Sequence, residues 1–175
     1  MRFKATIGCF LLMGLAISSC QKNDNTSVIP SISFQSFTAG GSSANPTATL
    51  QINFTDGDGD IGYPAQDTSA AANNLWIEYL YCDTAGTHKF IGFPNPQDTG
   101  VVYFFYHVPY ITPAGKDKSL KGIIQIAPLS DWFINPYVKI DSLKVEFRIW
   151  LFDRAGHKSN VITTPVILPY LTYGN

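Results

Sequence analysis

The stretch that decides the fold runs Leu143-Lys144-Val145-Glu146-Phe147-Arg148-Ile149-Trp150-Leu151, in which every second residue is apolar. Ala48-Thr49-Leu50-Gln51-Ile52-Asn53-Phe54-Thr55 repeats the same period. Because successive side chains of a strand point to opposite faces, this alternation predicts antiparallel strands with one buried face. We therefore expect Phe147 in the core and Arg148 on the opposite face.

Further apolar runs bounded by Gly and Pro extend the pattern along the chain. They are Ile32–Phe37, Leu75–Cys82, Val101–Val108, Leu120–Ala127 and Val161–Leu168, with a weaker run at His88–Phe93. Helical periodicity is not sustained anywhere, and at most Leu129–Ile134 forms one helical turn. About seven to eight short strands joined by turns predict an all-β, immunoglobulin-like antiparallel β-sandwich with long loops.

Composition fixes a broad class and excludes several functions. The chain has 175 residues, which suits one domain. Its 12 basic and 13 acidic residues give a net charge of −1, so no basic footprint indicates nucleic-acid binding. No phosphate-binding loop or Gly-x-Ser-x-Gly motif is present and the three histidines are scattered, so we expect a protein that is not an enzyme.

The N-terminus has the order of a secretory signal: basic Met1–Lys4, apolar Ala5–Ile17, then small residues before Cys20. Ile17-Ser18-Ser19-Cys20 resembles the lipobox of bacterial lipoproteins, and that resemblance implies a multiply acylated Cys20. We expect a signal peptide over 1–19, a lipidated tether over 20–28 and one β-sandwich domain over 29–175. The alternative is an ordinary signal peptide with a chance cysteine.

Residues Asp56-Gly57-Asp58-Gly59-Asp60-Ile61-Gly62, which we call the acidic loop, directly follow a predicted strand. Ca²⁺ takes six to eight oxygen ligands, and carboxylates on a flexible loop supply them. Asp67 stands where an EF-hand loop places its last ligand, but Ile61 occupies the position that an EF-hand reserves for glycine. The sequence therefore predicts a strand-loop Ca²⁺ site, and the alternative is a solvated Asp-Gly turn.

A second acidic loop follows the 143–151 strand and contains Asp153. In an immunoglobulin-like strand order, the 48–55 and 143–152 strands run parallel, so the loops that leave them lie at the same end of the sandwich. Asp153 is therefore a further candidate ligand beside Asp56 and Asp60. The alternative is that Arg154 simply neutralises Asp153.

Several motifs resemble known families. Phe54–Gly62 and Phe152–Pro165 together look like a family of small Bacteroidetes lipoproteins of unknown function. The second motif is also similar to a loop of bacterial immunoglobulin-like and cadherin-like repeats, with His157 in place of Asn. Cys20–Asp24 resembles the start of surface-exported lipoproteins, except that Asn23 replaces an acidic residue. The resemblance implies an outer-membrane lipoprotein that is either exposed at the cell surface or faces the periplasm.

Aromatic residues in the strands are candidates for ligand binding, namely Trp76, Tyr79, Tyr81 and Trp150. Exposed aromatic patches on a sandwich stack on sugar rings or dock a partner protein. The alternative is that loops 56–74 and 128–142 cover them as a second layer of core. We expect a binding or scaffolding role at the membrane lipid, within an envelope protein complex or on a glycan.

Overall fold

A computed structural model describes residues 26–42, 45–82, 90–92, 101, 103–111, 113, 117–127 and 144–167. The signal segment, Cys20 and the helical turn expected at 129–134 lie outside the described residues. Among the described residues, the one helical element is a single 3₁₀ turn, η1 (Ala70–Ala72). None of these residues forms a helix long and apolar enough to cross a membrane.

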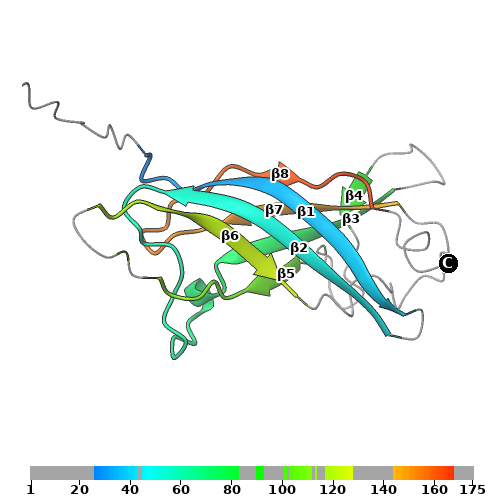
Figure 1. Ribbon diagram of the computed structural model, residues 1–175, viewed down its shortest axis with the longest axis horizontal. Coiled ribbons are helices and arrows are strands. Elements are labelled where there is room, and N and C mark those ends of the chain that lie inside the picture. Colours follow the sequence, from blue (N-terminus) through cyan, green and yellow to red (C-terminus); the bar gives the residue numbers. More distant parts are fainter. Residues whose placement is uncertain are drawn as a thin grey trace, which may run out of the picture.

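The fold is all-β, as the alternation predicts, with two antiparallel sheets (Figure 1). The first sheet has the order β1-β2-β6, with β1 (Ser31–Ser42), β2 (Asn45–Asp56) and β6 (Leu120–Ile126). The second has the order β4-β3-β7-β8, with β3 (Leu75–Cys82), β4 (Phe90–Gly92), β7 (Val145–Leu151) and β8 (Ile162–Thr163). The remaining strand, β5 (Tyr103–Tyr106), also pairs with β3. The immunoglobulin-like type stays a prediction.

Side chains from both sheets meet in one core. On β7, Val145, Phe147, Ile149 and Leu151 are at most 1% exposed, and they pack with β2 residues such as Leu50 and Ile52. The Phe147 ring lies 6.1 Å from that of Phe37 on β1, so the sheets face each other across the core. This is the face that the alternation assigns to Phe147.

Two strands end at other residues than the sequence predicts, one being shorter and one longer than its apolar run. Residues 75–82 form β3 as expected, whereas the 161–168 run forms only the two-residue β8 and an isolated bridge at Ile167. Pro165 lies between them and has no N–H to donate, which limits a strand there. β1 extends beyond its expected end at Phe37 to Ser42, because it pairs along nearly all of β2.

Strand pairing brings several chain segments to one end of the sandwich. Ser31 at the start of β1 pairs with Thr55, and Asp56 at the end of β2 pairs with Leu120. In the other sheet, Leu75 at the start of β3 pairs with Leu151 at the end of β7. The described segments at this end are 26–30, 56–74, 107–111, 117–119 and 152–160, and we call it the acidic end (Figure 1).

Truncating Phe147 to alanine should lower the free energy of unfolding by about 3–5 kcal/mol, because the ring is fully buried. Arg148→Ala is the matched control, since this side chain is exposed on the other face and pairs with Glu78 at 2.8 Å. Its loss should cost about 1–2 kcal/mol, because the buried Glu78 carboxylate would lose this ion pair. Urea denaturation of both variants measures this, and equal losses would contradict the assigned face.

Candidate metal centre

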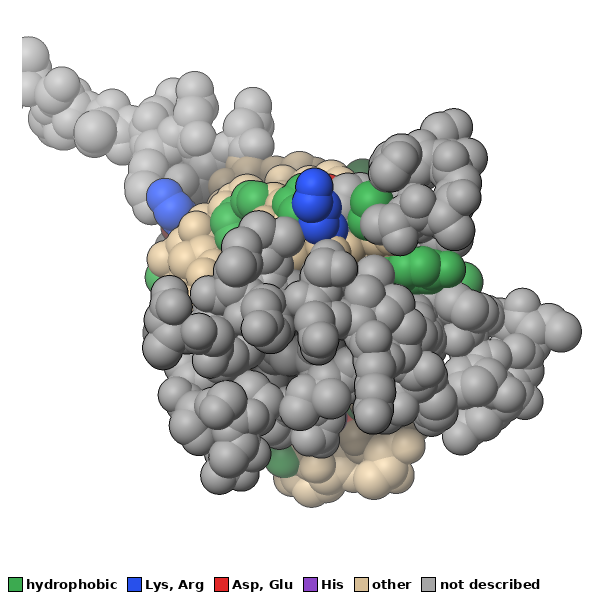
Figure 2. Space-filling model, turned by 90° about the vertical axis from the view of Figure 1, so that its right-hand side faces the viewer, with side chains coloured by type: hydrophobic (Ala, Val, Ile, Leu, Met, Phe, Trp, Pro, Cys, Tyr) green, Lys and Arg blue, Asp and Glu red, His purple; other side chains and the backbone are tan. Residues whose placement is uncertain are grey.

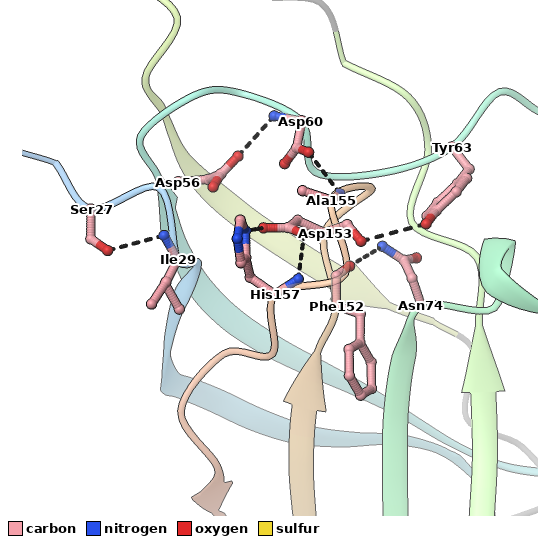
Figure 3. A network of polar contacts seen from close by, with 10 residues as sticks. All are labelled: Ser27, Ile29, Asp56, Asp60, Tyr63, Asn74, Phe152, Asp153, Ala155 and His157. Atoms are coloured by element: carbon pink, nitrogen blue, oxygen red, sulfur yellow. Dashed lines mark hydrogen bonds and ion pairs between the residues drawn. The ribbon is translucent and has the colours of Figure 1, made fainter.

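Three carboxylates converge at the acidic end. Asp56, Asp60 and Asp153 each offer one oxygen, and these oxygens all lie within 4.8 Å of one another. Asp56 is 0% exposed and Asp153 is 1% exposed, whereas Asp60 is half-buried. Figure 3 shows the three side chains pointing toward one another from the ends of β2 and β7. The parallel course expected for these two strands therefore places Asp153 beside the acidic loop.

The acidic loop is folded back on the end of β2 by its own backbone. The Asp60 amide donates to Asp56 Oδ2 at 2.9 Å, which closes a turn over Gly57–Gly59. Gly59 and Gly62 have φ of +71° and +81°, a backbone region that side chains with a Cβ rarely adopt. A Cβ at these positions would also collide with the carbonyl oxygens of Lys118 and Pro109. The glycines thus serve both the turn and its close packing.

The two acidic loops are joined directly. The Ala155 amide donates to Asp60 Oδ2 at 3.0 Å, and the Arg154 amide donates to the Asp60 carbonyl at 3.2 Å. The Arg154 guanidinium donates to the carbonyls of Ile61 and Gly62 at 3.3 and 2.6 Å and stacks over the Tyr110 ring at 4.6 Å. Arg154 therefore holds the acidic loop by hydrogen bonds to the loop's backbone carbonyls. It does not act as the direct partner of Asp153.

Asp153 is oriented by His157, which the sequence analysis did not assign to the site. The His157 amide donates to Asp153 Oδ1 at 2.7 Å, and its Nδ1 lies 2.8 Å from Asp153 Oδ2. The hydrogen bond with Asp153, together with the carboxylate charge, raises the pKa of His157. Asp153 and His157 are four residues apart, a spacing at which an Asp side chain can close a turn. This spacing is the sequence signal for the contact.

Two carboxylate oxygens of the cluster have no hydrogen-bond partner. Asp56 Oδ1 and Asp60 Oδ1 are buried and unsatisfied among the described residues. Burial, followed by the charge of Asp58, raises the pKa of Asp56 to about 6 from 3.8. Burial and the charge of Asp153 raise the pKa of Asp60 as well. Buried charges are normally paired or coordinate metals, so the arrangement has a place for a cation.

The other two predicted ligands lie outside the cluster. Asp58 is exposed, although its charge acts on both Asp56 and Asp60. Asp67 Oδ1 accepts a hydrogen bond from the Ser69 amide at 2.9 Å, and hydrogen bonds with Ser69 lower its pKa. Asp67 therefore orders its own turn, and three of the five predicted ligands, Asp56, Asp60 and Asp153, lie together in the cluster.

The candidate ligand-binding aromatics are divided between two faces. Trp76 and Trp150 lie together on the outer face of the second sheet, with ring centroids 5.8 Å apart. Tyr79 is 5% exposed in the core beside Phe147, and Tyr81 also packs against the core. These two tyrosines therefore do not share a surface with Trp76, because odd-numbered residues of β3 point inward.

Two further aromatic residues are exposed on the outer face, beside Trp76. Tyr103 and Phe105 on β5 are 38% and 46% exposed, and both rings contact Trp76. Alternation within the 101–108 run is the signal that places both on one face.

Comparison of the chain with family models, curated proteins and solved structures gives no match.

In chelator, the free energy of unfolding should fall as the pH rises from about 4 to about 6. The folded protein binds a proton at Asp56 more tightly than the unfolded chain does. Stability is therefore greatest at a pH low enough to protonate Asp56, and it falls as Asp56 ionises. Asp56→Asn cannot titrate and should reduce this fall by about 1–3 kcal/mol. Asp67→Asn is the control that keeps it. Urea denaturation at several pH values measures the slope, and an unchanged slope in Asp56→Asn would contradict the assigned burial.

Proposed function

We propose that this protein is a lipid-anchored β-sandwich of the bacterial outer membrane whose acidic end holds a structural Ca²⁺ ion. Its role is binding or scaffolding, within an envelope protein complex, and it is not catalytic. The metal proposal depends on two buried oxygens, Asp56 Oδ1 and Asp60 Oδ1, which have no hydrogen-bond partner among the described residues and belong to the carboxylate cluster that also contains Asp153.

The donor set favours Ca²⁺ over other common ions. All three candidate ligands are carboxylates, and hard oxygen ligands suit Ca²⁺ and Mg²⁺ rather than Zn²⁺, for which nitrogen and sulfur are usual. The ligands come from the acidic loop and from the loop after β7. Ligands on two loops form a flexible site rather than a rigid octahedral one. Ca²⁺ tolerates such geometry, whereas Mg²⁺ demands near-ideal octahedral coordination and dehydrates reluctantly.

A cation at this position would connect the two sheets. Asp56 ends β2 in the first sheet, and Asp153 follows β7 in the second. One ion bound by both would offset the repulsion among three carboxylates and hold the two loops together. The role we propose for it is structural for this reason.

The anchor proposal rests on the N-terminal sequence. A basic start, an apolar stretch and Ile17-Ser18-Ser19-Cys20 form the signal, and several acyl chains would hold the protein stably in a membrane. Residues Thr26–Ile29 are exposed as they lead into β1, as a tether requires.

A second candidate is a surface glycan-binding module. Tyr103 and Phe105 are exposed beside Trp76 on the outer face of the second sheet, and aromatic rings of this kind stack on sugars. The aromatic group differs from the predicted one, since it gains the two β5 residues and does not contain Tyr79 or Tyr81.

Calcium should stabilise the folded protein by about 2.7 kcal/mol at a hundredfold excess over its dissociation constant, because the ion binds only the folded state. Extracellular Ca²⁺ modules bind with constants of about 10⁻⁴–10⁻³ M, which sets the concentration range. Calorimetric melting in Ca²⁺, Mg²⁺ and chelator measures the gain, which should be smaller with Mg²⁺.

Asp60→Asn should abolish the Ca²⁺-dependent shift, since Asn can still accept the Ala155 hydrogen bond but contributes no charge. Asp67→Asn is the matched control and should keep the shift, because Asp67 lies outside the cluster. Melting temperatures indifferent to Ca²⁺ and to chelator would contradict the metal proposal.

Cys20→Ser should release the protein from membranes or leave its signal uncleaved, because the anchor would be lost. Fractionation of cells with detergent and mass measurement of the mature chain test this. A Cys20→Ser protein of mature length that stays in the membrane fraction would contradict the proposed anchor.

A further inference from the structure

The chain enters the sandwich against the acidic loop. Gly57 lies so close to the backbone carbonyls of Thr26 and Ser27 that a Cβ there would collide with them. At the other end of the same loop, Gly62 packs against the carbonyl of Pro109 in the same manner. The acidic loop therefore lies between the entry segment, which starts at Thr26, and the segment that contains Tyr110 and Ile111.

Both of these neighbouring segments expose large apolar side chains. Val28 and Ile29 are 49% and 50% exposed, and Tyr110 and Ile111 are 46% and 41% exposed. They are four of the nine large hydrophobic side chains exposed among the described residues, and they flank one loop. Ile123, at 51%, is by contrast alone on the outer face of β6.

The length of the tether places this end near a bilayer. Five residues lie between Cys20 and Thr26, and a fully extended chain spans at most about 20 Å over the six steps from one to the other. If Cys20 carries the lipid, as the proposed function has it, the acidic end cannot lie far from the headgroups. The end in Figure 2 is the opposite one, where β1 turns into β2.

We propose that the acidic end rests on the lipid surface, with Val28, Ile29, Tyr110 and Ile111 at the level of the headgroups. This contact is a second attachment in addition to the acylated cysteine. Tyrosine is enriched at membrane interfaces, where its ring and hydroxyl suit the boundary between apolar and wet regions. Arg154 contacts the Tyr110 ring at 4.6 Å and brings a positive charge to the same surface.

The negative charge of the acidic cluster weakens a contact with anionic lipids. Asp56, Asp60 and Asp153 would be repelled by anionic headgroups, and the exposed Asp58 would add to the repulsion. A bound divalent cation offsets two of these negative charges. The contact should therefore be firmer with Ca²⁺ than with chelator.

A fluorescent label attached at Ile111→Cys in the full-length lipidated protein tests the contact. The protein is reconstituted into vesicles of phosphatidylethanolamine and phosphatidylglycerol that contain lipids with quenchers near the headgroup. Ile123→Cys is the matched control, since it is equally exposed but lies on the outer face of β6. The native Cys82 is buried and should not react, which the unmodified protein checks.

We expect the label at 111 to be quenched at least about twofold more than the label at 123, in Ca²⁺ or in both Ca²⁺ and chelator. Equal, weak quenching at both positions in both conditions would overturn the proposal while leaving the anchor intact. Protection of the label at 111 only in native membranes, and not in protein-free vesicles, would overturn it in favour of a protein partner. Failure of the protein to associate with vesicles would overturn the anchor and this contact together.

Discussion

The repulsion among three carboxylates, confined at the point where two sheets end, is the constraint on which the functional part of this molecule depends. Asp56 and Asp153 are almost fully buried, and Asp60 is drawn against them by the Asp60 amide and the Ala155 amide. His157 contacts both carboxylate oxygens of Asp153, whereas Asp56 Oδ1 and Asp60 Oδ1 have no hydrogen-bond partner among the residues that the structure describes. The cation that we propose between them would offset the charge and coordinate the unpaired oxygens.

This constraint acts through the acidic loop on the surroundings of the site. The loop packs against the entry segment at Gly57, against Lys118 at Gly59 and against Pro109 at Gly62. Arg154 ties it to the loop after β7 through the Ile61 and Gly62 carbonyls. The entry segment, the three-carboxylate cluster and the segment at Pro109 are therefore packed together through the acidic loop, so the cation that we propose would order these neighbours along with the loop.

The sequence predicts the scaffold well and the site in part, for separate physical reasons. Period-2 alternation predicts the buried face of β7, and the expected parallel course of β2 and β7 predicts that Asp153 approaches the acidic loop. Which aspartates turn inward depends on the turn closed by the Asp60 amide, and the sequence does not show that Asp58 and Asp67 lie outside the cluster of Asp56, Asp60 and Asp153. β3 has large apolar residues on both faces and no clean alternation, so its sequence alone does not show that Tyr79 points into the core.

A crystal structure of the mature protein grown with CaCl₂ at neutral pH tests the central claim most directly. The account predicts one strong density peak among Asp56, Asp60 and Asp153, with oxygens of all three at about 2.3–2.6 Å, the distances that Ca²⁺ requires. Anomalous scattering would identify the ion. Carboxylates bridged by water, or by a shared proton at a short oxygen–oxygen distance, with no ion between them would contradict it.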